Sequence, residues 1–477
     1  MESDDRRQVL LLKSVQKLIA KYGSAAHLAF LAVAPLLLFP FSPDSTVATV
    51  LVWLAIPAWG WLMLEPSVRN GEAPHDARER VVRSVVRDPV FWLTLVLIVF
   101  TGLRALNTGI GMSYDAENAK WRVSSAIMPV YPGVIGSSGY LPFAAAFSLA
   151  VILQGTRHAL GKSARMSFLL VSSALAGFGA VISIVAVHLG DERAVAAARC
   201  LSPAYSFVGM AFGVFLLGGL VSLIAAFERR WDFAMLAAPL SVGGTAAGAF
   251  VFSPPLLVFT VAVAALLMLV YAFVYACRTL RSAGEFKYLV VLGISLTLGC
   301  LLVIAVLPDE ILQSRLDPLL SLKLLDDGFA EIRLTLSNVA VKTWLSNLWT
   351  GAGIGSFPLS FRFSASEADW ALVRGTVVAV PNGWWQVLAE RGVSGLLFLL
   401  LPAGFLLFTY LRRACEGFRT GAIPHPACLL GLLVPALLFA TGALDCSLWR
   451  ADVLIAAASL TAVSANSFLR LTRTKNG

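Results

Sequence analysis

A polar segment near the C-terminus, residues 308–392, carries a group of fixed positive charges. Arg333 and Lys342 lie in a stretch with helical spacing, and the same segment holds Arg315, Arg362, Arg374 and Arg391. Positioned cations suit an anionic phosphate, which arginine can bind through two parallel hydrogen bonds. The segment therefore predicts a site for a phosphate-bearing ligand, although a single arginine in such a loop is more often only solvated or in contact with a lipid headgroup.

Three glycines follow the helical stretch, in the order Gly351-x-Gly353-x-Gly355. Glycine lets backbone N–H groups approach a ligand closely, but the same spacing also makes a simple tight turn. The triplet does not follow a strand, which argues against a dinucleotide-binding loop. The segment also contains aromatic surfaces suited to sugars or lipid headgroups: Trp344, Trp349, Trp370, Trp384 and Trp385. Tryptophan collects at membrane interfaces without any further role as well.

The composition predicts that this polar segment belongs to an integral membrane protein. Of the 477 residues, 58% are hydrophobic and 14% are charged, where soluble proteins have about 25% charged residues. The mean hydropathy is +0.79. A net charge of +9 invites a nucleic-acid interpretation, but the basic residues lie in short loops between apolar runs, as in membrane proteins. We therefore expect a lipid bilayer, and no nucleic acid, as a partner.

Apolar runs of about 17–23 residues predict an all-α fold with about twelve transmembrane helices. The runs lie near residues 24–42, 46–64, 89–106, 138–154, 166–189, 203–226, 234–252, 255–276, 288–307, 393–411, 425–443 and 450–467. If the N-terminus is cytoplasmic, every short cytoplasmic loop is basic, and 24 of the 37 Lys and Arg residues lie inside. The charge pattern thus favours cytoplasmic N- and C-termini.

These runs divide the chain into five parts. Residues 1–23 predict a cytoplasmic amphipathic helix, and residues 24–307 predict spans one to nine with an outer loop at 107–137. Residues 308–392 form a large outer loop, which we expect to fold as short helices because a structureless loop of this length is unusual. Spans ten to twelve follow at 393–467, and a cytoplasmic tail at 468–477.

The arrangement resembles the O-antigen ligase and O-antigen polymerase family of bacterial envelope glycosyltransferases. That family has many spans and one large periplasmic loop before its last helices. Arg333 matches the arginine that leads a loop helix, and the family's glycine turn with its following small residue and Phe matches Gly351, Gly353, Gly355, Ser356 and Phe357. The downstream motif matches Asn382, Trp384, Trp385, Gln386, Leu388, Glu390 and Gly392.

The resemblance implies transfer of a glycan from a polyprenyl-diphosphate carrier to a glycan or lipid acceptor at the periplasmic face of the bacterial inner membrane, as in lipopolysaccharide assembly. It implies a reaction without metal or cofactor, and the sequence has no cluster of ligands at metal-binding spacing. Arg333 and Glu390 are the expected catalytic residues. The expected substrate-binding residues are Lys342, Arg315, Arg374, Gly353, Gly355, Asn382, Trp384 and Trp385.

The sequence departs from the family pattern at two positions. Pro381 stands where the family has a histidine that assists attack on the lipid-linked sugar, and proline can neither accept a proton nor donate a hydrogen bond. Leu348 stands where a proline is usual before the glycine turn. No histidine lies between His188 and His425, so a replacement base must be a carboxylate such as Glu390. Glu390 has a structural interpretation too, as a capping residue at a helix start.

Two other functions remain open. A catalytically altered relative that binds the lipid-linked glycan fits the loss of the histidine. A transporter or flippase for such a glycan fits a chain with about twelve spans, but it predicts polar residues within the spans. Ionisable residues here are rare in the apolar runs and lie near their ends, as at His27, Arg104, His188 and Asp452.

Overall fold

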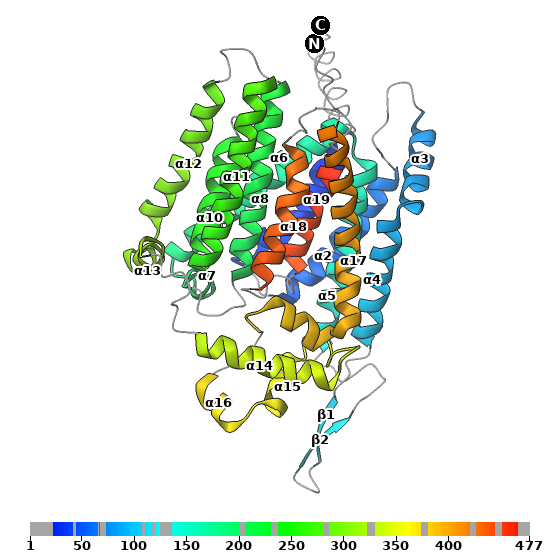
Figure 1. Cartoon of the computed structure of the whole chain (residues 1–477), viewed down its shortest axis with the longest axis vertical. Helices are drawn as coiled ribbons and strands as arrows, with labels where there is room; N and C mark the ends of the chain where they lie inside the picture. The colour runs from blue at the N-terminus through cyan, green and yellow to red at the C-terminus, as the bar shows by residue number, and fades with distance from the viewer. Residues whose placement is uncertain are drawn as a thin grey trace, which may run out of the picture.

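The fold is a bundle of helices with short helices and a β-hairpin at one end (Figure 1). The computed structural model describes residues 22–41, 44–64, 66, 73–106, 111–115, 120–124, 136–199, 206–229, 237–279, 286–321, 330–373, 380–419, 426–443 and 451–465. The expected amphipathic N-terminus and C-terminal tail lie almost entirely outside these residues.

Each predicted span coincides with a helix. After the first helix, Tyr22–Leu38, these are α2 (Asp44–Leu64), α4 (Pro89–Leu106), α5 (Gly136–Gln154), α6 (Lys162–His188), α8 (Ser206–Arg229), π-helix η3 (Pro239–Gly244) with α10 (Thr245–Val251), α11 (Pro255–Thr279), α12 (Phe286–Val306), α17 (Gly383–Arg419), α18 (Ala427–Gly442) and α19 (Ala451–Ala465).

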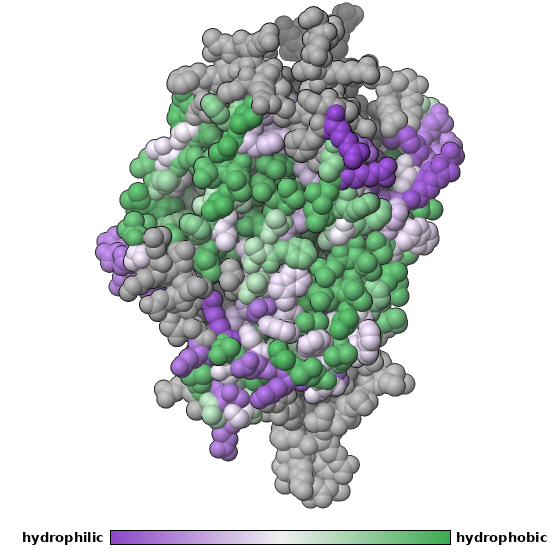
Figure 2. Space-filling view, in the orientation of Figure 1, coloured by the Kyte–Doolittle hydropathy of each residue, from purple (hydrophilic) through white to green (hydrophobic). Residues whose placement is uncertain are grey.

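The lengths of the apolar helices indicate a membrane protein. Among the described residues, Ser163–His188, Pro255–Tyr275 and Gly383–Arg412 are each long and apolar enough to cross a bilayer. A bent pair, α3 (Pro74–Val86) with α4, makes a fourth if it counts as one span. Large apolar side chains are exposed on the outside of the bundle, including Trp53, Leu103, Leu266 and Phe408. Figure 2 shows this apolar surface around the middle of the molecule.

Close approach of the helices depends on small residues. A Cβ added at Gly177 in α6 would lie 1.8 Å from the carbonyl oxygen of Leu240 in η3. In the same way, Gly243 in η3 lies against the backbone of Ser295 in α12. Because lipid chains are as apolar as leucine, membrane helices associate through such close packing rather than through the hydrophobic effect.

The polar segment between α12 and α17 is helical, as expected. It contains α13 (Asp309–Leu320), α14 (Ala330–Ser346), α15 (Phe357–Ser364) and α16 (Glu367–Val373). A separate small core, with Trp370 and Val373 of α16 packed against it, joins α14 and α15 to the start of α17: Leu336, Val339, Ala340, Phe357, Phe361, Val380 and Ala389. Ile311 of α13 belongs to the main core of the bundle instead. Helices α14 to α16 lie at the end of the bundle opposite α3 (Figure 1).

The described fold is mainly helical, as expected, with one β-hairpin as an exception. The loop 107–137 contains a β-hairpin of β1 (Gly111–Asp115) and β2 (Lys120–Ser124), at the same end as α14 to α16 (Figure 1). The strands are antiparallel, with Met112 opposite Val123 and Tyr114 opposite Trp121. The sequence analysis predicted this stretch only as part of an outer loop.

Candidate functional site

The glycine turn and the start of α17 are joined through their backbones. Residues 348–353 run beside residues 389–394, and we call this pairing the clasp. Its four hydrogen bonds run from Ala352 N to Ala389 O (2.8 Å), Gly353 N to Glu390 O (2.9 Å), Val393 N to Leu348 O (3.0 Å) and Ser394 N to Trp349 O (3.1 Å). The two halves of the motif matched in the sequence, which are far apart along the chain, therefore meet in one place.

Glycine is required on both sides of the clasp. Gly351 has φ 66° and Gly392 has φ 65°, a left-handed conformation that side chains rarely adopt. A Cβ at Gly351 would lie 2.4 Å from the backbone of Glu390 and Arg391, and one at Gly392 would lie 2.4 Å from the carbonyl group of Trp349. Gly392 also interrupts α17 with non-helical backbone angles. Gly353 and Gly355 have positive φ as well, at 123° and 74°.

The carboxylate of Glu390 lies inside the clasp and is 1% exposed. Its Oε1 accepts hydrogen bonds from the Gln386 side-chain amide at 2.7 Å and from the Phe357 backbone N–H at 3.3 Å. Phe357 is the first residue of α15, where a negative charge is favourable because the N–H groups of the first turn point outward. These contacts favour a positioning role for Glu390. It lies in α17 and its carboxylate binds the first turn of α15.

Gln386 extends this network. The sequence analysis matched it to the downstream motif of the family but assigned it no role. Its side-chain oxygen accepts a hydrogen bond from the Val380 N–H at 2.6 Å, while its amide group donates to Glu390. The side chain is fully buried. Gln386 and Glu390 lie one helical turn apart, so their spacing could have predicted the hydrogen bond between their side chains.

Asn382 caps α17. Its Oδ1 accepts from the backbone N–H groups of Trp384 at 3.0 Å and Trp385 at 3.2 Å, as a helix N-cap does. Its Nδ2 donates to the carbonyl of Ala443, at the end of α18, at 3.1 Å. Pro381, at the family's histidine position, is buried directly before this cap.

The two neighbouring tryptophans of α17 point to different partners. Trp385 packs against Trp344 of α14 with ring centres 6.0 Å apart, and Trp384 packs against Phe439 of α18 with ring centres 5.0 Å apart. Both tryptophans are half-buried. The start of α17 thus contacts one polar helix and one apolar helix through aromatic rings.

Arg333 and Lys342 lie on different faces of α14. Arg333 is half-buried and precedes Trp344 by eleven residues, about three turns, so both lie on one flank of the helix. Lys342 is exposed and lies about half a turn around the helix from Arg333. Hydrogen bonds from the Ser366 N–H and hydroxyl groups lower the pKa of Asp369, and the charge of Lys342 lowers it further. Lys342 therefore lies within electrostatic range of Asp369 in α16, on the side of α14 away from Arg333.

Two other predicted cations are placed differently. Arg315 is buried in α13, where its guanidinium donates to the backbone carbonyls of Ser253, at 2.8 Å, and Ala198. These partners belong to the rim of the bundle and not to the clasp, which favours a structural role. Arg374 lies outside the described residues.

Two buried polar atoms near the clasp have no hydrogen-bond partner among the described residues. They are Nε of Arg391, which follows Glu390, and Oγ of Ser360 in α15. Buried donors are nearly always satisfied, so an orphaned donor at a site marks a place for water or a ligand. Neither residue was assigned a role from the sequence, although Arg391 was counted among the cations of the segment. Within the described part of the chain, no three metal-ligating side chains converge.

Comparison with models of known protein families found no match, and comparison with curated proteins found none either.

Proposed function

We propose that this protein is a membrane glycosyltransferase of the O-antigen ligase or polymerase type. It transfers a glycan from a polyprenyl-diphosphate carrier to a saccharide or lipid acceptor at the periplasmic face of the bacterial inner membrane. The clasp is the observation that carries the proposal. It joins the glycine turn to the Glu390-Arg391-Gly392 segment by four backbone hydrogen bonds, beside the helix that presents Arg333.

The proposal includes a topology of about twelve spans with both termini in the cytoplasm. Helices α14 to α16 then lie on the periplasmic side, above the membrane-embedded carrier. The separation of α3, which carries four basic residues in or next to it, from α14 to α16 at the other end supports this orientation (Figure 1).

In the proposed reaction, the acceptor hydroxyl attacks the anomeric carbon while the bond from that carbon to the diphosphate oxygen breaks, and the hydroxyl proton passes to the departing diphosphate or to water. Negative charge grows on the departing diphosphate, and in this proposal Arg333 stabilises it. Trp344, on the same flank of α14, and Trp385, which packs against it, offer an aromatic surface for the glycan. Glu390 holds the turn and α15 in register as a positioning residue.

The proposal is tested with purified protein reconstituted in liposomes that contain polyprenyl-diphosphate-linked glycan and acceptor. We expect release of the carrier diphosphate together with glycosylated product. Arg333→Ala should lower the rate about 10²–10³-fold, as loss of one group that stabilises transition-state charge does. Lys342→Ala is the matched control on the other face of α14, and we expect a loss below tenfold. Equal rates for Arg333→Ala and wild type would overturn the assignment of Arg333.

A second candidate is a relative that binds the lipid-linked glycan without transferring it. Pro381 favours this candidate, because a buried proline occupies the position of the family's histidine and supplies no base. A general base contributes about 10²–10⁴-fold to such a reaction. Saturable binding of the lipid-linked glycan without carrier release would support this candidate. Movement of the glycan across the bilayer with its diphosphate bond intact would support a transporter instead.

A further inference from the structure

Helix α14 carries an exposed apolar stripe opposite the side that packs into the small core. The packed side contributes Leu336, Val339 and Ala340 to that core. The period of the α-helix places Leu334 and Leu345 on the opposite side, eleven residues or about three turns apart along one line. Leu334 is 65% exposed and Leu345 is 61% exposed, so the described part of the chain leaves this stripe uncovered.

The stripe continues into the turn after α14, where Leu348 and Trp349 are exposed as well. The clasp fixes this turn to α17, because the Trp349 carbonyl accepts hydrogen bonds from the Ser394 backbone N–H at 3.1 Å and from the Ser394 hydroxyl at 2.7 Å. Ser394 lies at the beginning of the apolar run of α17, a helix long and apolar enough to cross a bilayer. Trp349 is therefore held at the point where this span enters the membrane, a depth at which tryptophan is enriched.

The apolar surface of α17 begins next to this turn. Leu397 and Leu401 follow Ser394 at intervals of three and four residues, so all three lie on one side of α17. Both leucines are exposed, as expected of side chains that face lipid. Figure 1 shows α14 running across the end of the bundle, with α16 farther from the bundle than α14. The stripe of α14 and the lipid-facing side of α17 therefore meet at Trp349.

Two cations flank the stripe. Around the helix axis, Arg333 and Lys342 lie about a quarter turn to either side of the line through Leu334 and Leu345. Helices at a membrane surface commonly have Lys and Arg beside their apolar face, where the stems cover lipid and the charges reach the headgroup phosphates. The charge pattern thus favours a membrane over a soluble apolar partner.

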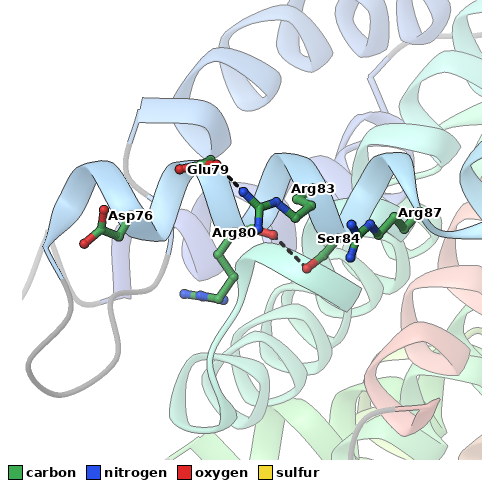
Figure 3. Close-up of a pocket in the computed structure, with 6 residues that line it drawn as sticks. All are labelled: Asp76, Glu79, Arg80, Arg83, Ser84 and Arg87. Atoms are coloured by element: carbon green, nitrogen blue, oxygen red, sulfur yellow. Dashed lines mark hydrogen bonds and ion pairs between the residues drawn. The ribbon is translucent and has the colours of Figure 1, made fainter.

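The surface of α3, at the other end of the bundle, has a different character. It is hollowed into a groove of about 220 Å³. Charged side chains and one serine line this groove (Figure 3): Asp76, Glu79, Arg80, Arg83, Ser84 and Arg87. Charged groups of this kind are readily solvated by water. The stripe of α14 has no polar group at Leu334 or Leu345, so it needs an apolar partner where the groove of α3 does not.

We propose that α14 lies in the bilayer interface, with its stripe of Leu334, Leu345, Leu348 and Trp349 among the upper parts of the acyl chains and with α16 on the water side. The bilayer itself covers the stripe, because the clasp fixes one end of the stripe to a helix that enters the same bilayer. Arg333 and Lys342 then lie at the level of the headgroup phosphates. This inference does not depend on the glycosyltransferase proposal.

Bimane attached to single cysteines of the full chain tests the proposal, with the native cysteines replaced by alanine and the protein in phosphatidylcholine nanodiscs. Leu334→Cys and Leu345→Cys place the label on the stripe, at exposed positions. Leu397→Cys on α17 is the lipid-facing control, and Glu367→Cys on α16 is the water-facing control. Lipids brominated near the headgroup end of their acyl chains should quench both stripe labels at least about threefold more strongly than the Glu367→Cys label. Iodide in the buffer should show the opposite order.

Three outcomes would overturn the proposal. Bromolipid quenching of the stripe labels no greater than at Glu367→Cys, together with strong quenching by iodide, would place α14 in water. Weak quenching by both reagents would show that protein covers the stripe, either a partner or a second copy of the chain. Lipids brominated near the ends of their chains should quench the stripe labels less than the Leu397→Cys label, because an interfacial helix lies only about 5–10 Å into the boundary between headgroups and acyl chains. The reverse order would place the stripe in the centre of the bilayer and not at its interface.

Discussion

Glu390 shows how a residue with the chemistry of a base can serve another purpose. Its carboxylate is almost fully buried and receives two hydrogen bonds, from the Gln386 side chain and the Phe357 N–H. A base must reach the proton that it removes, and these contacts point the carboxylate at the start of α15 instead. Within the proposed reaction, Glu390 therefore acts through the position of the glycine turn.

Substitution of Glu390 separates the two roles. Glu390→Ala leaves two buried donors without an acceptor, so we expect the free energy of unfolding to fall by about 1–3 kcal/mol for each. Glu390→Gln keeps an acceptor oxygen, and transfer should stay within about tenfold of wild type if the residue only positions the turn. Thermal unfolding in detergent and the transfer assay provide the two readouts. Glu367→Ala, an exposed carboxylate of α16, is the control. Full stability with abolished transfer in Glu390→Gln would instead make Glu390 the base.

Individual residues were predictable from the sequence to different degrees. The match of Asn382 to a motif singled it out, but its role as the cap of α17 required the structure. The opposite faces of Arg333 and Lys342 were implicit in their spacing of nine residues, two and a half turns. The burial of Arg315 could not be predicted from the sequence, because its carbonyl partners, Ser253 and Ala198, lie far away in the chain.

At the scale of elements, the clasp depends on glycine more than on any side chain. Gly351 and Gly392 face each other across it with positive φ and without space for a Cβ. Any other residue at Gly351 or Gly392 would have a strained left-handed backbone, and its Cβ would also clash with the backbone of the opposite segment.

We expect Gly351→Ala to lower the free energy of unfolding by at least about 2 kcal/mol, since left-handed backbone alone costs alanine about 1–2 kcal/mol. Gly404→Ala is a matched control within α17, where a Cβ would meet nothing within 4 Å. Alanine there should leave stability unchanged or raise it by about 0.5–1 kcal/mol. Chemical denaturation in detergent measures both. A Gly351→Ala protein as stable as wild type would show that the clasp can shift without cost.

The elements themselves were largely predictable, because a run of apolar residues long enough for a bilayer has few alternatives to a helix. The hairpin of β1 and β2 was not predictable, since its strands are only five residues each and lie in a polar stretch. The clasp was also beyond prediction in detail, because it consists of backbone contacts, which side-chain patterns do not encode.

At the scale of the whole molecule, α3 and α14 to α16 occupy opposite ends of the bundle (Figure 1). The apolar surface between them shows in Figure 2. This arrangement agrees with the distribution of basic loops along the sequence, which favours α3 on the cytoplasmic side. The orientation across the membrane is part of the proposed function, and it can be measured directly.

Cysteine labelling tests this orientation, with native cysteines replaced by alanine. Glu367→Cys in α16 and His75→Cys in α3 introduce exposed thiols at the two ends. A maleimide that cannot cross membranes should label Glu367→Cys in intact spheroplasts and His75→Cys only after permeabilisation. Reaction of both positions from the same side would contradict an arrangement of α3 and α16 on opposite sides. Exclusive labelling of His75→Cys in spheroplasts would invert the molecule and remove the periplasmic site.

The clasp has a consequence for how such a chain can diversify. The segment from Ile354 to Leu388 leaves the bundle and returns to it at one fixed point, so its ends stay in place whatever lies between them. Added length in such an excursion costs only about 0.6 kcal/mol for each doubling. New residues inserted after Val373 would therefore enlarge this excursion while Arg333 and the helix cap at Asn382 keep their positions. Under the proposed function, selectivity for acceptors could change in this way without changes in the membrane-embedded helices.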